Sequence, residues 1–143
     1  MTGTSEIMHA SCVAWDGRAA LIIGASGSGK SSLALALMAF GAELVSDDRT
    51  QVMEDQNGLW ASAPASISGM IEARGIGILN AVACPRAQVS FVVDMDKTEN
   101  ARFPEPKRTR ILGQDIAALH NVDSPAFAAA ILQYLKSDIR GTS

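Results

Sequence analysis

A glycine-rich octapeptide decides the fold of this chain: Gly24-Ala25-Ser26-Gly27-Ser28-Gly29-Lys30-Ser31. Its fixed positions match the phosphate-binding P-loop, in which glycines let the backbone turn so that its N–H groups point at phosphate oxygens. An apolar strand, residues 19–23, enters the loop, and an Ala/Leu-rich helix leaves it, as the motif requires. We therefore expect residues 24–31 to bind a nucleotide.

Each part of the loop has a defined task in that chemistry. Lys30 is a point charge for the β- and γ-phosphates of ATP, and the Ser31 hydroxyl is a ligand for Mg²⁺. The N-terminus of the following helix adds partial positive charge beneath the same anion. We expect the Lys30 side chain to be exposed, contributing charge to the ligand and little to the core.

The segments beside the loop predict strands and one helix. Residues 9–15 and 18–23 are apolar and are separated by Asp16-Gly17, which is typical of a β-hairpin. Residues 31–40 form the predicted helix, with Gly41 placed as its C-terminal cap.

Further along the chain, residues 42–46, 49–53, 59–62 and 89–93 predict strands, the last one buried. Residues 94–110 are polar and predict an exposed loop. A last helix is predicted from Ser124-Pro125 to about Lys136, with one apolar face. That face holds Phe127, Ile131, Tyr134 and Leu135. The fold class expected is α/β, a mixed sheet with hairpins and few helices.

Composition restricts the function classes. The 143 residues are 48% hydrophobic and 19% charged, which excludes a disordered chain and suits one domain over 1–143. The net charge of −3 argues against nucleic acid or an anionic membrane as a partner. Cys12 and Cys84 lie in apolar segments and predict buried, reduced thiols. No apolar run approaches the roughly 20 residues of a membrane span, and the N-terminus is no signal peptide, so a cytoplasmic protein is expected.

Two positions compete for the carboxylate near the metal. Asp94 ends the apolar strand at 89–93, as an ordinary Walker B aspartate does. Asp47-Asp48 ends the strand at 42–46, and two adjacent carboxylates can divide metal binding and proton abstraction between them. Neighbours on a strand point to opposite faces, so only one of the pair is expected to face the phosphate. The residues alone leave Asp94 and the pair equally placed.

Three segments together resemble the HPr kinase/phosphorylase family, which uses ATP to phosphorylate a serine of HPr, a small carrier protein of the phosphotransferase system. They are residues 8–48, from Met8-His9 through the P-loop to the aspartate pair; residues 71–80, Ile-Glu-Ala-Arg-Gly-Ile-Gly-Ile-Leu-Asn; and Asn100-Ala101-Arg102. The resemblance implies a kinase core of the HPr kinase/PEP carboxykinase type, which needs ATP and Mg²⁺.

The resemblance also implies residue roles. His9 lies beside the catalytic carboxylates, and Asp47 or Asp48, with Asp48 favoured, accepts the serine proton. Glu72 joins Ser31 on Mg²⁺, and Arg74 neutralises phosphate charge. Gly75 and Gly77 after it suggest close backbone packing there. Arg102 closes over the transferring phosphoryl group, a part that Lys107, Arg108 or Arg110 can also take.

The departures from the family pattern imply a short form that holds the catalytic domain alone. The family's acidic residues around the P-loop are replaced by Ala25 and Ser32. Its arginine-bearing segment linked to dephosphorylation has no counterpart after Leu119. We therefore expect an HPr-like protein as substrate, with the reverse phosphorylase reaction weak.

The resemblance implies a homo-oligomer, hexameric in full-length relatives, and Ala126, Ala129 and Ala130 give the last helix a small-residue flank suited to contact. The alternative functions are a P-loop small-molecule kinase and a nucleotide-binding regulatory module without transfer activity.

Overall fold

A computed structural model describes residues 4–141 of the chain. In this range a mixed sheet is covered on one face by two α-helices. The elements are β1 (Ser5–Met8), β2 (Ala10–Trp15), β3 (Arg18–Ile23), α1 (Lys30–Ala39), β4 (Glu43–Ser46), β5 (Thr50–Asp55), β6 (Gly58–Ser62), the 3₁₀ turn η1 (Ala65–Ile67), β7 (Met70–Ala73), β8 (Gly77–Asn80), β9 (Ala87–Thr98), β10 (Lys107–Ile111), β11 (Gln114–Asn121) and α2 (Phe127–Gly141). The expected α/β class with few helices is confirmed.

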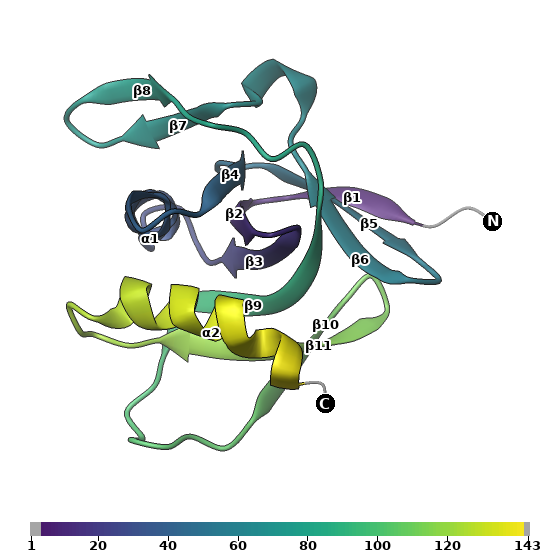
Figure 1. The fold of residues 1–143 in the computed structure, drawn as a ribbon, viewed down its shortest axis with the longest axis vertical. Helices are drawn as coiled ribbons and strands as arrows, with labels where there is room; N and C mark the ends of the chain where they lie inside the picture. Colours follow the sequence, from purple (N-terminus) through teal and green to yellow (C-terminus); the bar gives the residue numbers. More distant parts are fainter. Residues whose placement is uncertain (1–3, 142–143) are drawn as a thin grey trace.

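Strand β9 joins the parts of the sheet. The main order is β1-β5-β6-β9-β3-β2-β4, and β11 pairs with β9 while β10 pairs with β11. Strand β9 is 12 residues long, parallel to β3 and β11 and antiparallel to β6. It curls through the molecule, so that β1, β5 and β6 extend to one side and the β7–β8 hairpin stands apart at the top of Figure 1. The phosphate loop follows β3, beside the carboxyl end of β9.

The β2–β3 hairpin forms as predicted. Ala10 pairs with Ile23 and Trp15 with Arg18, so the register closes on the two-residue turn. Asp16 and Gly17 in that turn have φ of 52° and 79°, the left-handed values of a type I′ hairpin turn. This turn fixes which residues of β2 face the helices.

The alternation along β2 divides two hydrophobic cores. Ala10, Cys12 and Ala14 pack into the core on the sheet face away from the helices. Val13 packs into the other core, which includes Leu37 of α1. Residues two apart in a strand share a face, so Ser11 lies on the α1 face, at the end of β2 nearest the phosphate loop.

Helix α1 ends at a glycine cap, as expected. Gly41 has φ of 111°, its N–H donates to Met38 O, and Ala42 N–H donates to Leu37 O. These bonds satisfy the last carbonyls of the helix as in a Schellman motif. The helix begins at Lys30, one residue before the prediction.

The predicted loop at 94–110 is partly wrong. Strand β9 continues to Thr98, and Lys107 begins β10, so the loop is reduced to residues 99–106. Polar residues form these strands because β10 pairs only with β11, and alternate residues of it face solvent. Helix α2 begins at Phe127 and runs to Gly141, beyond the predicted end near Lys136.

The predicted apolar face of α2 is confirmed in part. Ile131 and Leu135 are buried, whereas Tyr134 is half-exposed and its ring meets Phe91 edge-on at a centroid distance of 4.8 Å. Both cysteines are free and buried, as expected. None of the helices described between residues 4 and 141 is long and apolar enough to cross a membrane.

Candidate active site at the phosphate loop

The loop needs glycine where its backbone turns most sharply. Gly24 has φ of 148°, and a Cβ placed on it would lie 2.6 Å from Ser28 Oγ. Gly29, just before α1, has φ of 100°. L-residues with a side chain rarely adopt these angles, so the glycines set the curve that carries the chain from β3 into α1.

Lys30 is folded back onto its own loop. Its Nζ donates to Gly24 O at 2.9 Å and to Ala25 O at 3.0 Å, and only 5% of the residue is exposed. The expectation of an exposed lysine is therefore wrong. The two carbonyls replace the water that a free ammonium would hold, which makes burial of this charge tolerable.

A cleft of about 320 Å³ lies against the loop and α1. Its lining residues come from the loop, the end of β4 and the β7–β8 hairpin: Ser26, Gly27, Gly29, Lys30, Ser31, Ser32, Asp48, Glu72 and Arg74. Three segments distant in sequence thus bring a lysine, three serine hydroxyls, two carboxylates and a guanidinium to one opening.

Asp47, and not Asp94, lies beside the P-loop serine. Its Oδ1 accepts the Ser31 hydroxyl at 2.5 Å, and its Oδ2 accepts Glu72 N–H at 3.0 Å. Asp94 instead accepts the N–H of Asp96, and its carboxylate lies 4.0 Å from Lys97 Nζ. The geometry favours Asp47 as the carboxylate beside the P-loop serine.

Asp48 points into the cleft because the strand has already ended. Strand β4 stops at Ser46, and Asp48 has φ of 66°, outside the β region. Of the two aspartates, Asp48 lines the cleft and Asp47 does not, but the positive φ of Asp48, and not strand alternation, turns its side chain there. His9 Nε2 donates to Asp48 Oδ1 at 2.7 Å, which places the histidine beside this carboxylate.

Strand β7 alternates between the core and the cleft. Ile71 and Ala73 are buried, Ile71 in the core that also holds α1, whereas Glu72 and Arg74 line the cleft. The expectation of close packing at the following glycines is wrong, because a Cβ on Gly75 or Gly77 would meet nothing within 4 Å. Their φ values of 83° and 137° show that they serve the turn instead.

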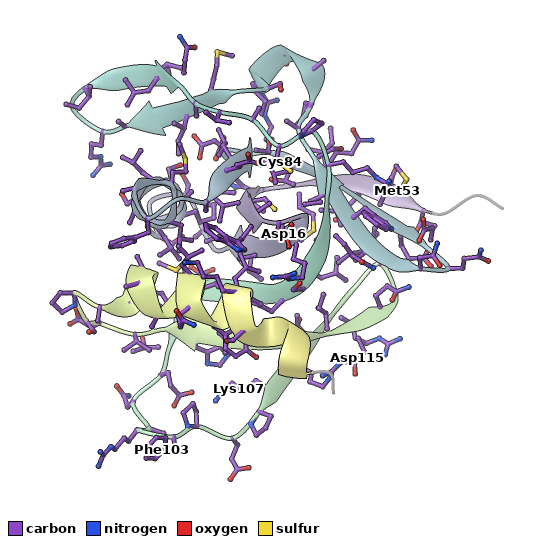
Figure 2. The ribbon with its side chains drawn as sticks, in the orientation of Figure 1. Asp16, Met53, Cys84, Phe103, Lys107 and Asp115 are labelled. Carbon is purple, nitrogen blue, oxygen red and sulfur yellow. The ribbon has the colours of Figure 1, made fainter. Side chains whose placement is uncertain are left out.

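Arg102 does not line this cleft. It lies in the 99–106 loop, with its guanidinium carbon 5.2 Å from the centre of the Phe103 ring. Phe103 is at the bottom of the view in Figure 2, whereas α1 and the β7–β8 hairpin occupy the upper part. The three alternatives to Arg102 lie in β10: Lys107 pairs with Glu99, Arg108 pairs with Asp115, and Arg110 donates to Gly113 O.

Two residues that the sequence did not single out contact the site. Ser11 is fully buried and donates to Asp47 Oδ1 at 2.9 Å. Both carboxylate oxygens of Asp96 lie 3.0 Å from Ala25 N, so the end of β9 holds the first turn of the loop. A serine inside the apolar run of β2 was the one available signal for Ser11, and Asp96 fell in the segment predicted as loop.

The oxygen ligands fit a magnesium ion. Between residues 4 and 141 no group of three or more His, Cys, Asp or Glu side chains is arranged to hold a metal ion by itself. Mg²⁺ prefers oxygen and usually takes one or two carboxylates together with substrate phosphates. The Ser31 hydroxyl and the carboxylates of Asp47 and Glu72 are donors of this kind, beside the phosphate loop.

Comparison with known families and proteins gives consistent matches. A family model described as the HPr serine kinase C-terminal domain matches residues 2–118. HPr kinase/phosphorylase of Listeria monocytogenes is 35% identical over 122 residues, which cover 76% of this chain and 39% of that relative. The enzyme of the same name from Bacillus pumilus is 34% identical over 112 residues, 69% of this chain and 36% of the relative. The chain therefore spans about two fifths of the length of these curated relatives.

A solved structure has the same fold. The HPr(Ser) kinase/phosphatase of Coxiella burnetii superposes with a TM-score of 0.78 at 24% identity, over 96% of this chain and 97% of that one. Because this match covers 96% of the chain, it includes most of the residues after 118, where the family model ends.

Proposed function

The chain belongs to the HPr serine kinase family, matching the model of its C-terminal domain, and on this premise we propose that it is an ATP- and Mg²⁺-dependent kinase that phosphorylates a serine of an HPr-like phosphocarrier protein. The observation that carries the proposal is the placement of Asp48, next to His9, in the cleft that the phosphate loop also lines. A bare nucleotide site has no need of such a base, whereas transfer to a hydroxyl does.

The loop binds the ATP phosphates. Ser26, Gly27 and Gly29 of the loop line the cleft together with Lys30 at the N-terminus of α1, where free backbone N–H groups attract the anion. Lys30 exchanges its bonds to Gly24 O and Ala25 O for the β- and γ-phosphate oxygens. Arg74, just after β7, adds a second positive charge to the lining of the cleft. These groups stabilise the charge that spreads over the γ-phosphoryl oxygens during transfer.

Asp47 and Glu72 belong to the part of the site that would hold Mg²⁺. Bound Mg²⁺ would neutralise charge on the β- and γ-phosphates. The oxygen of the Ser31 hydroxyl can give a lone pair to the ion while the same hydroxyl donates its hydrogen bond to Asp47 Oδ1. Glu72 reaches the same side from β7, and its N–H fixes Asp47 Oδ2. Asp47 therefore orients the serine ligand.

Asp48 acts as the general base. The substrate serine oxygen attacks the γ-phosphorus, the bond from that phosphorus to the β–γ bridging oxygen breaks, and ADP leaves. The serine proton passes to the Asp48 carboxylate. His9 holds Oδ1 of that carboxylate by its bond of 2.7 Å, which leaves Oδ2 for the serine. Positioning and charge stabilisation account for the rest of the rate enhancement.

The reverse reaction is proposed to be weak. Attack of inorganic phosphate on a phosphoserine brings two anions into one cleft, so it needs more positive charge than the forward reaction. Among the described residues that line the cleft, Lys30 and Arg74 are the cations. The loss of one well-placed donor to developing phosphate charge costs about 10²–10³ in rate.

Incubation with γ-labelled ATP, with and without a purified HPr-like protein, tests the proposal. We expect label on a serine of that protein, and far less with the Asp48→Asn variant. Label in a small molecule of a cell extract would identify a small-molecule kinase instead. Nucleotide binding without any transfer would identify a regulatory module. Pyrophosphate released from phosphorylated protein and phosphate, as fast as the forward transfer, would contradict the weak reverse reaction.

A further inference from the structure

We propose that Ser11 is a positioning residue that joins Asp47 and Asp48 into one unit. The proposal rests on the proposed kinase function, because it explains how the two carboxylates of that site are held. Ser11 does not line the cleft, so any effect it has on transfer must pass through the aspartates.

One hydroxyl contacts both members of the pair. Ser11 Oγ donates to Asp47 Oδ1 at 2.9 Å and accepts Asp48 N–H at 3.1 Å. Its exposure is zero, and its neighbours in β2, Ala10 and Cys12, are apolar residues of the opposite core. A hydroxyl has one donor and can accept at the same time, which is the combination that this position needs. Alanine lacks the hydroxyl and would supply neither bond.

The bond to Asp47 completes the set of donors around that carboxylate. Oδ1 receives Ser11 and Ser31, and Oδ2 receives Glu72 N–H. The two side-chain donors come from different elements, β2 and α1. Without Ser11, the Oδ1 atom keeps only Ser31, which is also the proposed metal ligand. The serine in β2 therefore fixes Asp47 independently of what Ser31 binds.

The bond to Asp48 holds an unfavourable backbone. Asp48 has φ of 66°, a conformation that costs a residue with a side chain free energy and persists where the surroundings hold it. The start of β2 grips both of its backbone groups, since Asp48 N–H donates to Ser11 Oγ and Asp48 O accepts Ala10 N–H at 3.0 Å. This conformation directs the Asp48 side chain toward the cleft and His9.

A purely structural role makes a different prediction, and Thr50 provides the control. Thr50 is also fully buried, and its hydroxyl donates to Ala10 O at 2.8 Å. It lies in β5, beside the same start of β2, but bonds neither aspartate. Ser11→Ala and Thr50→Val each remove one buried hydroxyl without introducing a larger side chain.

The test compares Ser11→Ala, Ser11→Thr and Thr50→Val by kcat, KM for ATP and melting temperature. We expect Ser11→Ala to lower kcat about 10- to 100-fold with KM for ATP within about threefold, because a small misplacement of reacting groups is costly. Thr50→Val should lower the melting temperature by a similar amount and keep its kcat. Ser11→Thr, which retains the hydroxyl, should recover most of kcat. An unchanged kcat in Ser11→Ala, or an equal loss in Thr50→Val, overturns the proposal.

A second measurement separates this proposal from the proposed function. If the unaltered protein transfers no phosphate to an HPr-like protein, the function fails, and crystal structures of Ser11→Ala and the unaltered protein then decide the role of Ser11. We expect Asp48 to leave its positive φ, or Asp47 Oδ1 to move off Ser31, in the alanine variant only. Both aspartates unmoved in that variant would overturn the positioning role.

Discussion

Asp47 Oδ1 accepts the hydroxyl hydrogen of Ser31 at 2.5 Å, across 16 residues of sequence. This bond ties the end of β4 to the first turn of α1. It also separates the two candidates for the Walker B position, because Asp94 makes its bonds along β9 instead. The site is thus assembled from β4 rather than from the strand whose pattern looks more ordinary.

Asp48→Asn should slow transfer strongly, and Asp94→Asn should not. The asparagine keeps the shape of the side chain but cannot take the serine proton, and general-base catalysis contributes about 10²–10⁴-fold. We expect kcat to fall by about that factor with ATP binding retained. Asp94→Asn, the matched control, should stay within about threefold of the unaltered enzyme. A dead Asp94→Asn beside an active Asp48→Asn would restore the ordinary Walker B assignment.

Lys30→Met should lose both affinity and stability. The ammonium carries a charge-assisted bond worth about 1.5–3 kcal/mol, so the Kd for ATP should rise roughly 10- to 100-fold. Because Lys30 is buried on Gly24 O and Ala25 O, the melting temperature should fall as well. Fluorescent-nucleotide titration and thermal unfolding measure the two effects. Lys97→Met, at an exposed lysine nearby, should show neither.

Asp96→Ala should weaken nucleotide binding through the loop backbone. Both carboxylate oxygens of Asp96 hold Ala25 N–H, and Ala25 does not line the cleft, so the contact braces the loop from behind. The loss of one hydrogen bond to a charged group should raise the KM for ATP about 10-fold. Asp96→Asn keeps an acceptor, so its KM for ATP should lie between those of Asp96→Ala and the unaltered protein. Asp115→Ala removes an exposed acid paired with Arg108 and should leave KM unchanged.

Both cysteines should resist alkylation in the folded protein. Burial raises the pKa of Cys12, and the nearby Cys84 raises it further; burial is also the main cause that raises the pKa of Cys84. A raised thiol pKa means less thiolate at a given pH, and thiolate is the species that reacts. Iodoacetamide at pH 8 should modify neither cysteine until denaturant unfolds the chain. Mass spectrometry that finds fast labelling of Cys12 without denaturant would contradict the burial.

Self-assembly remains a prediction. Ala126, Ala129 and Ala130 are exposed, the last two on the outer side of α2, where small side chains allow close approach by another surface. We expect light scattering at micromolar concentration to give a mass above that of one chain. A monomer mass would refute the prediction. Substitution of Ala129 by glutamate should reduce the mass if this flank carries the contact.

The sequence predicted the structural elements that depend on single turn and cap residues. Asp16-Gly17 and Gly41 occupy backbone conformations that few other residues adopt, so the hairpin and the end of α1 were recognisable. The turn of the β10–β11 hairpin carries a weaker signal: Gly113 has φ of 80°, but the residue before it is Leu112, at φ of 50°, a conformation that leucine rarely adopts. The hairpin is held in the sheet because β11 pairs with β9. A local sequence pattern cannot predict a pairing partner more than 20 residues away.

The candidate site was predictable from two sources: the loop from its own motif, and Asp48, Glu72 and Arg74 from the resemblance to a known family. The loop, Asp48, Glu72 and Arg74 do line one cleft. The division between Asp47 and Asp48 was not predictable, since it depends on the positive φ of Asp48, which breaks the period of two that a strand implies. Ser11 acts across 36 residues of sequence, and its contact follows from the register of β2 against β4.

Lys30 Nζ already donates hydrogen bonds to two carbonyls of its own loop, so an anion that binds there has to replace them. A ligand has to replace two carbonyl oxygens that already solvate the ammonium, so a weakly charged anion gains almost nothing from the lysine. A polyphosphate offers several charged oxygens at once and outcompetes the carbonyls. The loop should therefore discriminate by charge density as well as by shape, with chloride or sulfate at ordinary concentrations competing poorly against ATP.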